Sequence, residues 1–144
     1  PILPIFEYDK FLDCLATLVP YKLDELLQLT LYFDFDKSNI TAQAAFELDK
    51  LVQLMTKYES IVIRAESHTD SRGSASYNLS LSERRALTTA QYVISKGIDA
   101  ARITGVGKGE TTPNVDCDGR CSEEEHQLNR RSEFFILAGN PNNE

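Results

Sequence analysis

The sequence lacks any apolar run that approaches the roughly 20 residues needed for a membrane-spanning helix. Charged residues interrupt even its most apolar third, at Asp13, Asp24, Glu25, Asp34 and Asp36. Positive charge is also scarce, because 15 Lys and Arg residues stand against 22 Asp and Glu residues, for a formal net charge of -7. Nucleic-acid-binding surfaces need clustered Lys and Arg, so this balance argues against one.

Motifs of catalysis are missing as well. The sequence contains no GxSxG nucleophile elbow, no HExxH zinc motif and no glycine-rich phosphate loop. A metal site would have to draw on His68, Asp70, Cys117, Cys121 and His126, and the spacing Cys-x-x-x-Cys-x-x-x-x-His is not a common zinc pattern. The sequence therefore predicts neither a catalytic centre nor a metal centre.

Cysteine is scarce, with three in the chain. Cys14 lies in FLDCLATL, whose pattern is typical of a helix face and predicts a buried free thiol. Cys117 and Cys121 are four residues apart in DCDGRC. This spacing is compatible with a local disulfide and equally with two free thiols, so both remain open.

What is present is the periodicity of one α/β domain, for which 144 residues suffice. Alternating apolar residues and turn chemistry predict strands at 27–36, 60–67, 102–107 and 132–137, and apolar residues at three- and four-residue steps predict helices at 41–57 and 81–96. A long polar loop precedes the last strand. This order predicts a two-layer α/β fold with right-handed crossovers between parallel strands.

The stretch HTDSRGSASYNLSLSERRA, residues 68–86, places a carboxylate and a guanidinium around one loop. Asp70 follows the second predicted strand, and Arg85 lies in a helix whose start carries the capping-box pattern of Ser80 and Glu83. Asp70 and Arg85 could form an ion pair, or Asp70 could act in acid–base catalysis. Alternatively, Asp70 could bind the ammonium and Arg85 the carboxylate of an amino-acid head group.

This stretch resembles the signature of the OmpA-like (OmpA/MotB C-terminal) peptidoglycan-binding domain. The matching residues are Thr69, Asp70, Gly73, Tyr77, Asn78, Leu81, Ser82, Arg85 and Ala86. In addition, YFDFDKSNI resembles the family's first strand and turn, GKGETTP its glycine-rich segment, and NRRSEFFIL its last strand. The resemblance runs in order from about residue 27 to residue 137.

The resemblance implies an α/β (α+β) two-layer sandwich of order βαβαββ, with a mixed sheet and helices on one face. It places the OmpA-like domain at residues 27–139. Residues 1–26 are then an N-terminal extension or linker, in which FLDCLATLV and LDELLQL are candidate helices. Residues 140–144 are expected to be a disordered tail.

The resemblance also implies non-covalent binding of peptidoglycan through the diaminopimelate residue of the stem peptide. By position, Asp70 would hold the ammonium of diaminopimelate and Arg85 its carboxylate, with backbone donors from the start of the second helix. Further pocket-lining candidates are Asp36, Ser38, Asn39, Thr69, Asn78 and Arg130. Arg84 is expected to face solvent, and Arg131 is a weaker candidate than Arg130.

The implied role is to anchor the outer membrane, or an attached envelope protein, to the cell wall from the periplasmic side, with no cofactor and no enzymatic activity. The loop around Cys117 and Cys121 resembles a subgroup common among Bacteroidetes-type envelope proteins, and a periplasmic setting favours the disulfide. Two alternatives are a cell-wall hydrolase and a purely structural envelope interaction domain. The sequence does not fix the oligomeric state.

Overall fold

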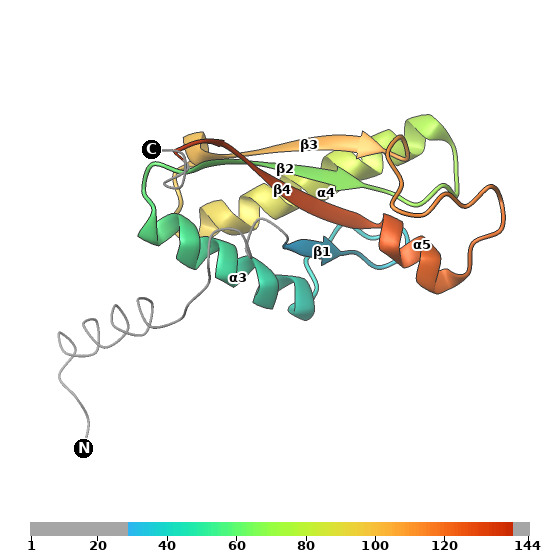
Figure 1. Cartoon of the computed structure of the whole chain (residues 1–144), viewed down its shortest axis with the longest axis horizontal. Coiled ribbons are helices and arrows are strands. Elements are labelled where there is room, and N and C mark those ends of the chain that lie inside the picture. The colour runs from blue at the N-terminus through green and yellow to red at the C-terminus, as the bar shows by residue number, and fades with distance from the viewer. Residues whose placement is uncertain (1–28, 140–144) are drawn as a thin grey trace, which may run out of the picture.

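A computed structural model describes residues 29–139, which form a four-stranded mixed sheet and three helices (Figure 1). The elements in chain order are β1 Thr30–Tyr32, α3 Ala42–Lys57, β2 Val62–His68, α4 Ala75–Ser95, a 3-10 turn at Ala100–Arg102, β3 Ile103–Gly109, α5 Glu123–Asn129 and β4 Arg131–Ala138. The predicted extension at 1–26, its candidate helices, Cys14 and the tail at 140–144 lie outside the described residues.

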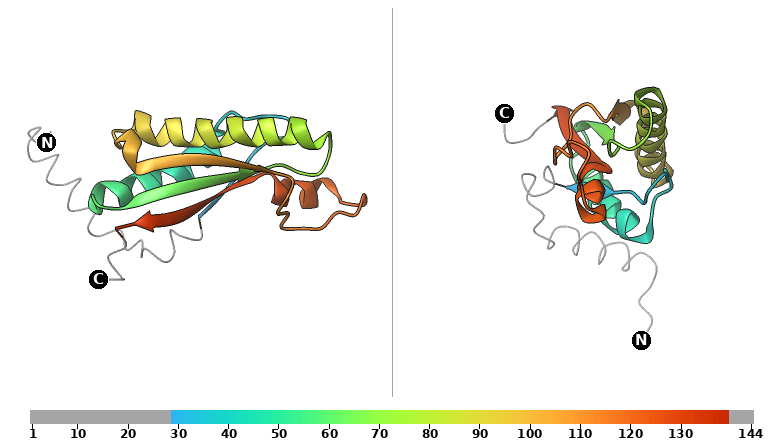
Figure 2. Two further views of the ribbon diagram at one scale, coloured as in Figure 1. Left: turned by 90° about the horizontal axis from the view of Figure 1, so that it is seen from above. Right: turned by 90° about the vertical axis from the view of Figure 1, so that its right-hand side faces the viewer.

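The strand order is β1-β4-β2-β3. β2 and β3 run parallel, and β4 is antiparallel to both β1 and β2. α3 and α4 lie on the same face of the sheet, and α5 lies at the end of the sheet where β4 begins (Figures 1 and 2). This arrangement confirms the predicted two-layer βαβαββ fold with helices on one face.

The core lies between this sheet face and the two long helices. Side chains spaced three and four residues apart on α3 pack with α4 and the inward-facing residues of β2, and they include Leu48, Leu51, Met55, Ile63, Ala65, Ala90 and Val93. Thr41 caps α3 by accepting a hydrogen bond from the Ala44 amide. The predicted helix at 41–57 and its inner face are therefore confirmed.

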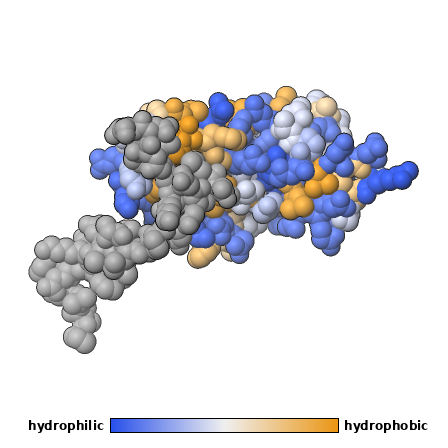
Figure 3. All heavy atoms as spheres, in the orientation of Figure 1, coloured by the Kyte–Doolittle hydropathy of each residue, from blue (hydrophilic) through white to orange (hydrophobic). Residues whose placement is uncertain are grey.

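The opposite face of the sheet carries charged and apolar side chains in alternation. Glu66 pairs with Lys108 at 3.2 Å, and the Arg64 guanidinium lies over the Phe135 ring. On the side shown in Figure 3, apolar patches are interleaved with hydrophilic residues. No helix among residues 29–139 is long and apolar enough to span a membrane.

Two predicted boundaries were wrong. Among the described residues, the strand predicted at 27–36 extends only over β1, because after the buried Phe33 the chain turns, Asp36 adopts a left-handed conformation (φ 56°), and Phe35 is 54% exposed. The helix predicted from residue 81 begins at Ala75, where the Ser74 side chain accepts from the Tyr77 amide. Ser80 lies within this helix and accepts from Arg84, so the Ser80–Glu83 capping box does not form.

One helix was missed in the predicted polar loop. α5 is preceded by a capping box in which the Ser122 side chain and the Glu125 backbone, and the Glu125 side chain and the Ser122 backbone, bond reciprocally. The same Ser-x-x-Glu pattern in the sequence was therefore the signal for α5.

Glycines in β3 set the distance between α4 and the sheet. A Cβ atom at Gly105 would lie 2.6 Å from the Ala86 carbonyl oxygen, and one at Gly107 would lie 2.5 Å from the Glu83 amide nitrogen. Because any side chain would push α4 away, these glycines let its middle lie close to the sheet. This packing positions Arg85 beside the end of β2.

Candidate functional site

A pocket of about 220 Å³ lies where β2 ends and α4 begins. Its lining combines two carboxylates, two guanidiniums and a partly apolar rim: Phe35, Asp36, Thr69, Asp70, Arg72, Gly73, Tyr77, Asn78, Leu81 and Arg85. Pockets for drug-sized ligands measure about 300–1,000 Å³, so this one suits a group the size of a single amino acid. The structure thus brings Asp70 and Arg85 to one pocket.

Asp70 is 4% exposed, and its carboxylate accepts three hydrogen bonds from cationic and backbone donors. Its Oδ1 accepts from the Arg72 amide at 3.0 Å, and its Oδ2 accepts from Arg72 Nη2 at 2.8 Å and Arg130 Nη1 at 3.3 Å. Burial alone would raise the pKa of Asp70, but the hydrogen bonds and charge of Arg72, together with Arg130, hold that pKa below its usual value. The Asp70 side chain is therefore ionised at neutral pH.

Arg85 is fully buried, and three backbone carbonyls hold its guanidinium in place. Nε donates to Lys37 at 2.8 Å, Nη1 to His68 at 3.0 Å and Nη2 to Asp34 at 3.1 Å. Burial, followed by the positive charge of Arg130, lowers the pKa of Arg85 to about 10, so it stays charged at neutral pH. Since a guanidinium has five N–H groups, two are not used in these three hydrogen bonds within the described structure.

Asp70 and Arg85 do not form an ion pair with each other within the described structure. Each is held by other groups, Asp70 by Arg72 and Arg130, and Arg85 by main-chain oxygens. The alternative of a direct Asp70–Arg85 ion pair is therefore not observed in residues 29–139.

Arg72 lines the pocket and was not predicted from the sequence. Besides binding Asp70, its guanidinium lies 4.2 Å from the centre of the Phe35 ring, and its side chain is 37% exposed at the pocket. The available signal was its position two residues after Asp70, which suits a side chain that turns back onto that carboxylate.

The other candidates divide into two groups. Asp36, Thr69 and Asn78 line the pocket, whereas Ser38 and Asn39 are not among its lining residues. The Tyr77 hydroxyl donates to Asp36 and the Asn78 side-chain amide donates to the Asp70 carbonyl oxygen, so the first turn of α4 borders the pocket.

Arg130 lies behind the pocket and supports it. Its Nε donates to the Phe33 carbonyl at 2.8 Å, and its Nη1 contacts Asp70. Arg131 is bound to Glu133 and to the Thr112 carbonyl, away from Asp70. Arg84 is exposed, as expected.

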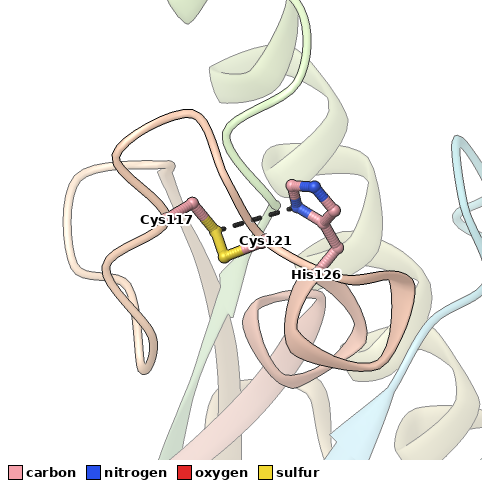
Figure 4. A group of neighbouring side chains, drawn as sticks. All are labelled: Cys117, Cys121 and His126. Atoms are coloured by element: carbon pink, nitrogen blue, oxygen red, sulfur yellow. Dashed lines mark hydrogen bonds between the residues drawn. A yellow bond between two sulfur atoms is a disulfide. The ribbon is translucent and has the colours of Figure 1, made fainter.

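The fold brings three of the candidate metal ligands together, Cys117, Cys121 and His126, and places His68 and Asp70 elsewhere. Cys117 and Cys121 form a disulfide, with His126 Nδ1 at 3.8 Å from Cys117 Sγ (Figure 4). A disulfide offers no thiolate to a metal, so this cluster is not a zinc site. His68 lies elsewhere, with its Nδ1 beside the Thr112 hydroxyl.

A second hollow of about 560 Å³ lies between β1 and α3. Its described lining includes Asp34 and Glu47 but no Lys or Arg. This described lining therefore lacks the opposed charges that the first pocket has.

Comparison with known proteins yields a family and a fold. A model of the OmpA family matches residues 32–127. The chain is 36% identical over 113 residues to outer membrane porin F of Pseudomonas aeruginosa, covering 78% of this chain and 31% of the porin. It is 38% identical over 88 residues to a peptidoglycan-associated lipoprotein of Rhizobium meliloti, covering 61% of this chain and 50% of the lipoprotein.

The fold agrees with these sequence matches. The crystal structure of the peptidoglycan-associated lipoprotein from Burkholderia pseudomallei superposes with a TM-score of 0.71 at 25% identity, covering 76% of this chain and 91% of that one. The chain spans half or less of the length of the two curated relatives, so their full-length properties do not transfer with the match.

Proposed function

The chain belongs to the OmpA family, whose members bind peptidoglycan without catalysing a reaction, and on that premise we propose that its pocket binds the diaminopimelate residue of a stem peptide. Asp70 accepts the ammonium group of that residue, and the two remaining N–H groups of Arg85 bind its carboxylate. The observation that carries this proposal is that Asp70 and Arg85 line one small pocket without pairing with each other.

The geometry supports a zwitterionic ligand. A bidentate bond from a guanidinium fixes the orientation of a carboxylate, and Arg85 is pre-organised because three carbonyls already hold its side chain. Charge-assisted hydrogen bonds contribute about 1.5 to 3 kcal/mol each, which gives selectivity with modest affinity.

We place this binding at the periplasmic face of the outer membrane, where the domain tethers the membrane or an attached envelope protein to the cell wall. The names of the two curated relatives, an outer membrane porin and a peptidoglycan-associated lipoprotein, support a cell-envelope setting. A Bacteroidetes-type origin stays a prediction from the loop around Cys117 and Cys121.

The two alternatives make different predictions for purified sacculi. A binding module sediments with sacculi and releases nothing, a hydrolase releases soluble muropeptides, and a purely structural domain does neither. The described residues offer a hydrolase neither a metal centre nor an activated nucleophile in the pocket.

The test uses co-sedimentation with diaminopimelate-type sacculi. Asp70→Asn removes the charge that binds the ammonium, so we expect sedimentation to be lost, whereas Asp118→Asn on the exposed loop is its control and should sediment like the unmodified protein. Asp70→Asn protein that sediments normally would show that the site is assigned incorrectly.

Arg85→Lys tests the other half of the pocket. A lysine keeps the positive charge but cannot form the bidentate hydrogen bonds of a guanidinium, so we expect sedimentation to be lost. We also expect the free energy of unfolding to fall by about 2 to 4 kcal/mol, because the three backbone carbonyls lose their hydrogen-bond donors. Arg84→Lys, at the exposed neighbouring position, should change neither quantity. Undiminished sedimentation of folded Arg85→Lys protein would remove Arg85 from the ligand site.

A further inference from the structure

Glu123 lies outside the pocket lining, yet it binds both arginines that hold Asp70. Its Oε2 is 3.1 Å from Arg72 Nη1, and its Oε1 is 2.9 Å from Arg130 Nη1. Arg72 and Arg130 in turn contact Asp70 Oδ2 at 2.8 and 3.3 Å. The four side chains therefore form a closed ring in which two carboxylates alternate with two guanidiniums.

This ring determines the net charge of the site. The charged side chains that line the pocket, or that form ion pairs with those lining it, are three carboxylates and three guanidiniums: Asp36, Asp70, Glu123, Arg72, Arg85 and Arg130. Three negative and three positive charges give zero, which suits a ligand that carries one ammonium and one carboxylate. Without Glu123 the same set carries +1.

The excess positive charge would fall on the half of the pocket that receives an ammonium. Asp70 already bonds to two guanidiniums, and their positive charges repel a third cation unless another carboxylate also pairs with them. Glu123 is the carboxylate that pairs with both guanidiniums. The Glu110 side chain contacts Asn78 and does not belong to the ring.

We propose that Glu123 is a positioning residue that makes the pocket selective for a zwitterion over an anion, an inference that rests on the proposed function. It acts through Arg72 and Arg130 and does not touch the ligand. The hydrogen bond and charge of Arg130, with those of Arg72, lower the pKa of Glu123, so it is ionised at neutral pH.

The disulfide-closed loop explains how Glu123 is held at this place. Cys121 is followed directly by the helix cap Ser122 and then by Glu123. At the other end of α5, the Asn129 side chain accepts from the Asn114 and Val115 amides and donates to the Val115 carbonyl. α5 is thus fastened at both ends to the loop that carries it.

The experiment measures the affinity of Glu123→Gln protein by calorimetry for three stem peptides. They carry at the third position diaminopimelate, lysine, which lacks the second carboxylate, or 2-aminopimelate, which lacks the second ammonium. We expect affinity for the diaminopimelate and lysine peptides to fall about threefold to fivefold, the range for partly exposed ion pairs. Affinity for the 2-aminopimelate peptide should stay the same or rise.

Glu124→Gln is the matched control, because it removes the same charge from the next, exposed position of α5, and it should bind all three peptides like the unmodified protein. Equal weakening of all three peptides by Glu123→Gln would show a merely structural role, and affinities equal to those of Glu124→Gln would show no role. An unmodified protein that binds no diaminopimelate peptide would instead overturn the proposed function itself.

Discussion

Arg85 is the largest of the completely buried side chains among the described residues. Its position next to Ala86, which matches the signature of the family, was enough to choose it over Arg84 from the sequence. That it holds the carbonyls of Asp34, Lys37 and His68 was not predictable, because these contacts join residues up to 51 positions apart. At this site one guanidinium fixes the loop after β1, and in the proposed function it also offers donors to the ligand.

His68 gives a pH-dependence of stability at the residue scale. Burial, then the positive charge of Arg131, lowers the pKa of His68 to about 4, and its buried Nε2 has no hydrogen-bond partner among residues 29–139. The unfolded chain titrates near 6.5, so the neutral imidazole stabilises the fold above that pH, and this stabilisation is lost as pH falls towards 4. We expect about 2 to 3 kcal/mol of the stability lost between pH 7 and pH 4 to come from His68.

The measurement is the free energy of unfolding in urea at several pH values between 4 and 7. His68→Gln should lose less stability with falling pH than the unmodified protein, whereas His126→Gln, at the chain's second histidine, should keep the full slope. If His68→Gln and the unmodified protein show the same slope, His68 is not the group that titrates.

At the scale of elements, the start of α4 is the boundary with the clearest consequence. Ser74 accepts from the Tyr77 amide, whereas Ser80 is exposed within the helix. Ser74→Ala should therefore lower the free energy of unfolding by about 1 kcal/mol, the usual cost of losing a cap. Ser80→Ala should leave stability unchanged or slightly higher, because alanine favours helix interiors.

Urea denaturation of the two variants compares these helix starts directly. If Ser80→Ala destabilised the domain more than Ser74→Ala did, the helix would begin where the sequence pattern first indicated, and Tyr77 and Asn78 would not lie in its first turn.

The elements show why local patterns succeeded in part. The apolar spacing of α3 and the alternation of Ile61, Ile63 and Ala65 predicted those elements because their burial is periodic. The start of α4 was misplaced because Ser80 and Glu83 match the capping-box pattern, whereas the actual cap, Ser74, has Tyr77 and not Glu or Gln three residues later. α5 was missed because it is seven residues long and has one buried residue, so it carries almost no periodic signal.

At the scale of the whole molecule, an acidic chain carries a pocket whose charges balance. The site is built from the C-terminal end of β2, the start of β4, the loop after β1, the start of α4, and α5. These parts meet at one end of the sheet (Figure 1). The sequence predicted Asp70 and Arg85 through one contiguous motif. It could not reveal the ring through Arg72, Arg130 and Glu123. The two contacts that close this ring, Arg72 with Glu123 and Asp70 with Arg130, join residues 51 or more positions apart, and such contacts leave no local pattern in the sequence.

The central claim is that this pocket holds the diaminopimelate head group, and a crystal structure with a diaminopimelate-containing stem peptide bound tests it most directly. The account predicts the ammonium within hydrogen-bonding distance of Asp70 and the carboxylate on the two remaining N–H groups of Arg85, with Glu123 still on Arg72 and Arg130. A peptide seated in the hollow between β1 and α3, or one that contacts neither Asp70 nor Arg85, would contradict it.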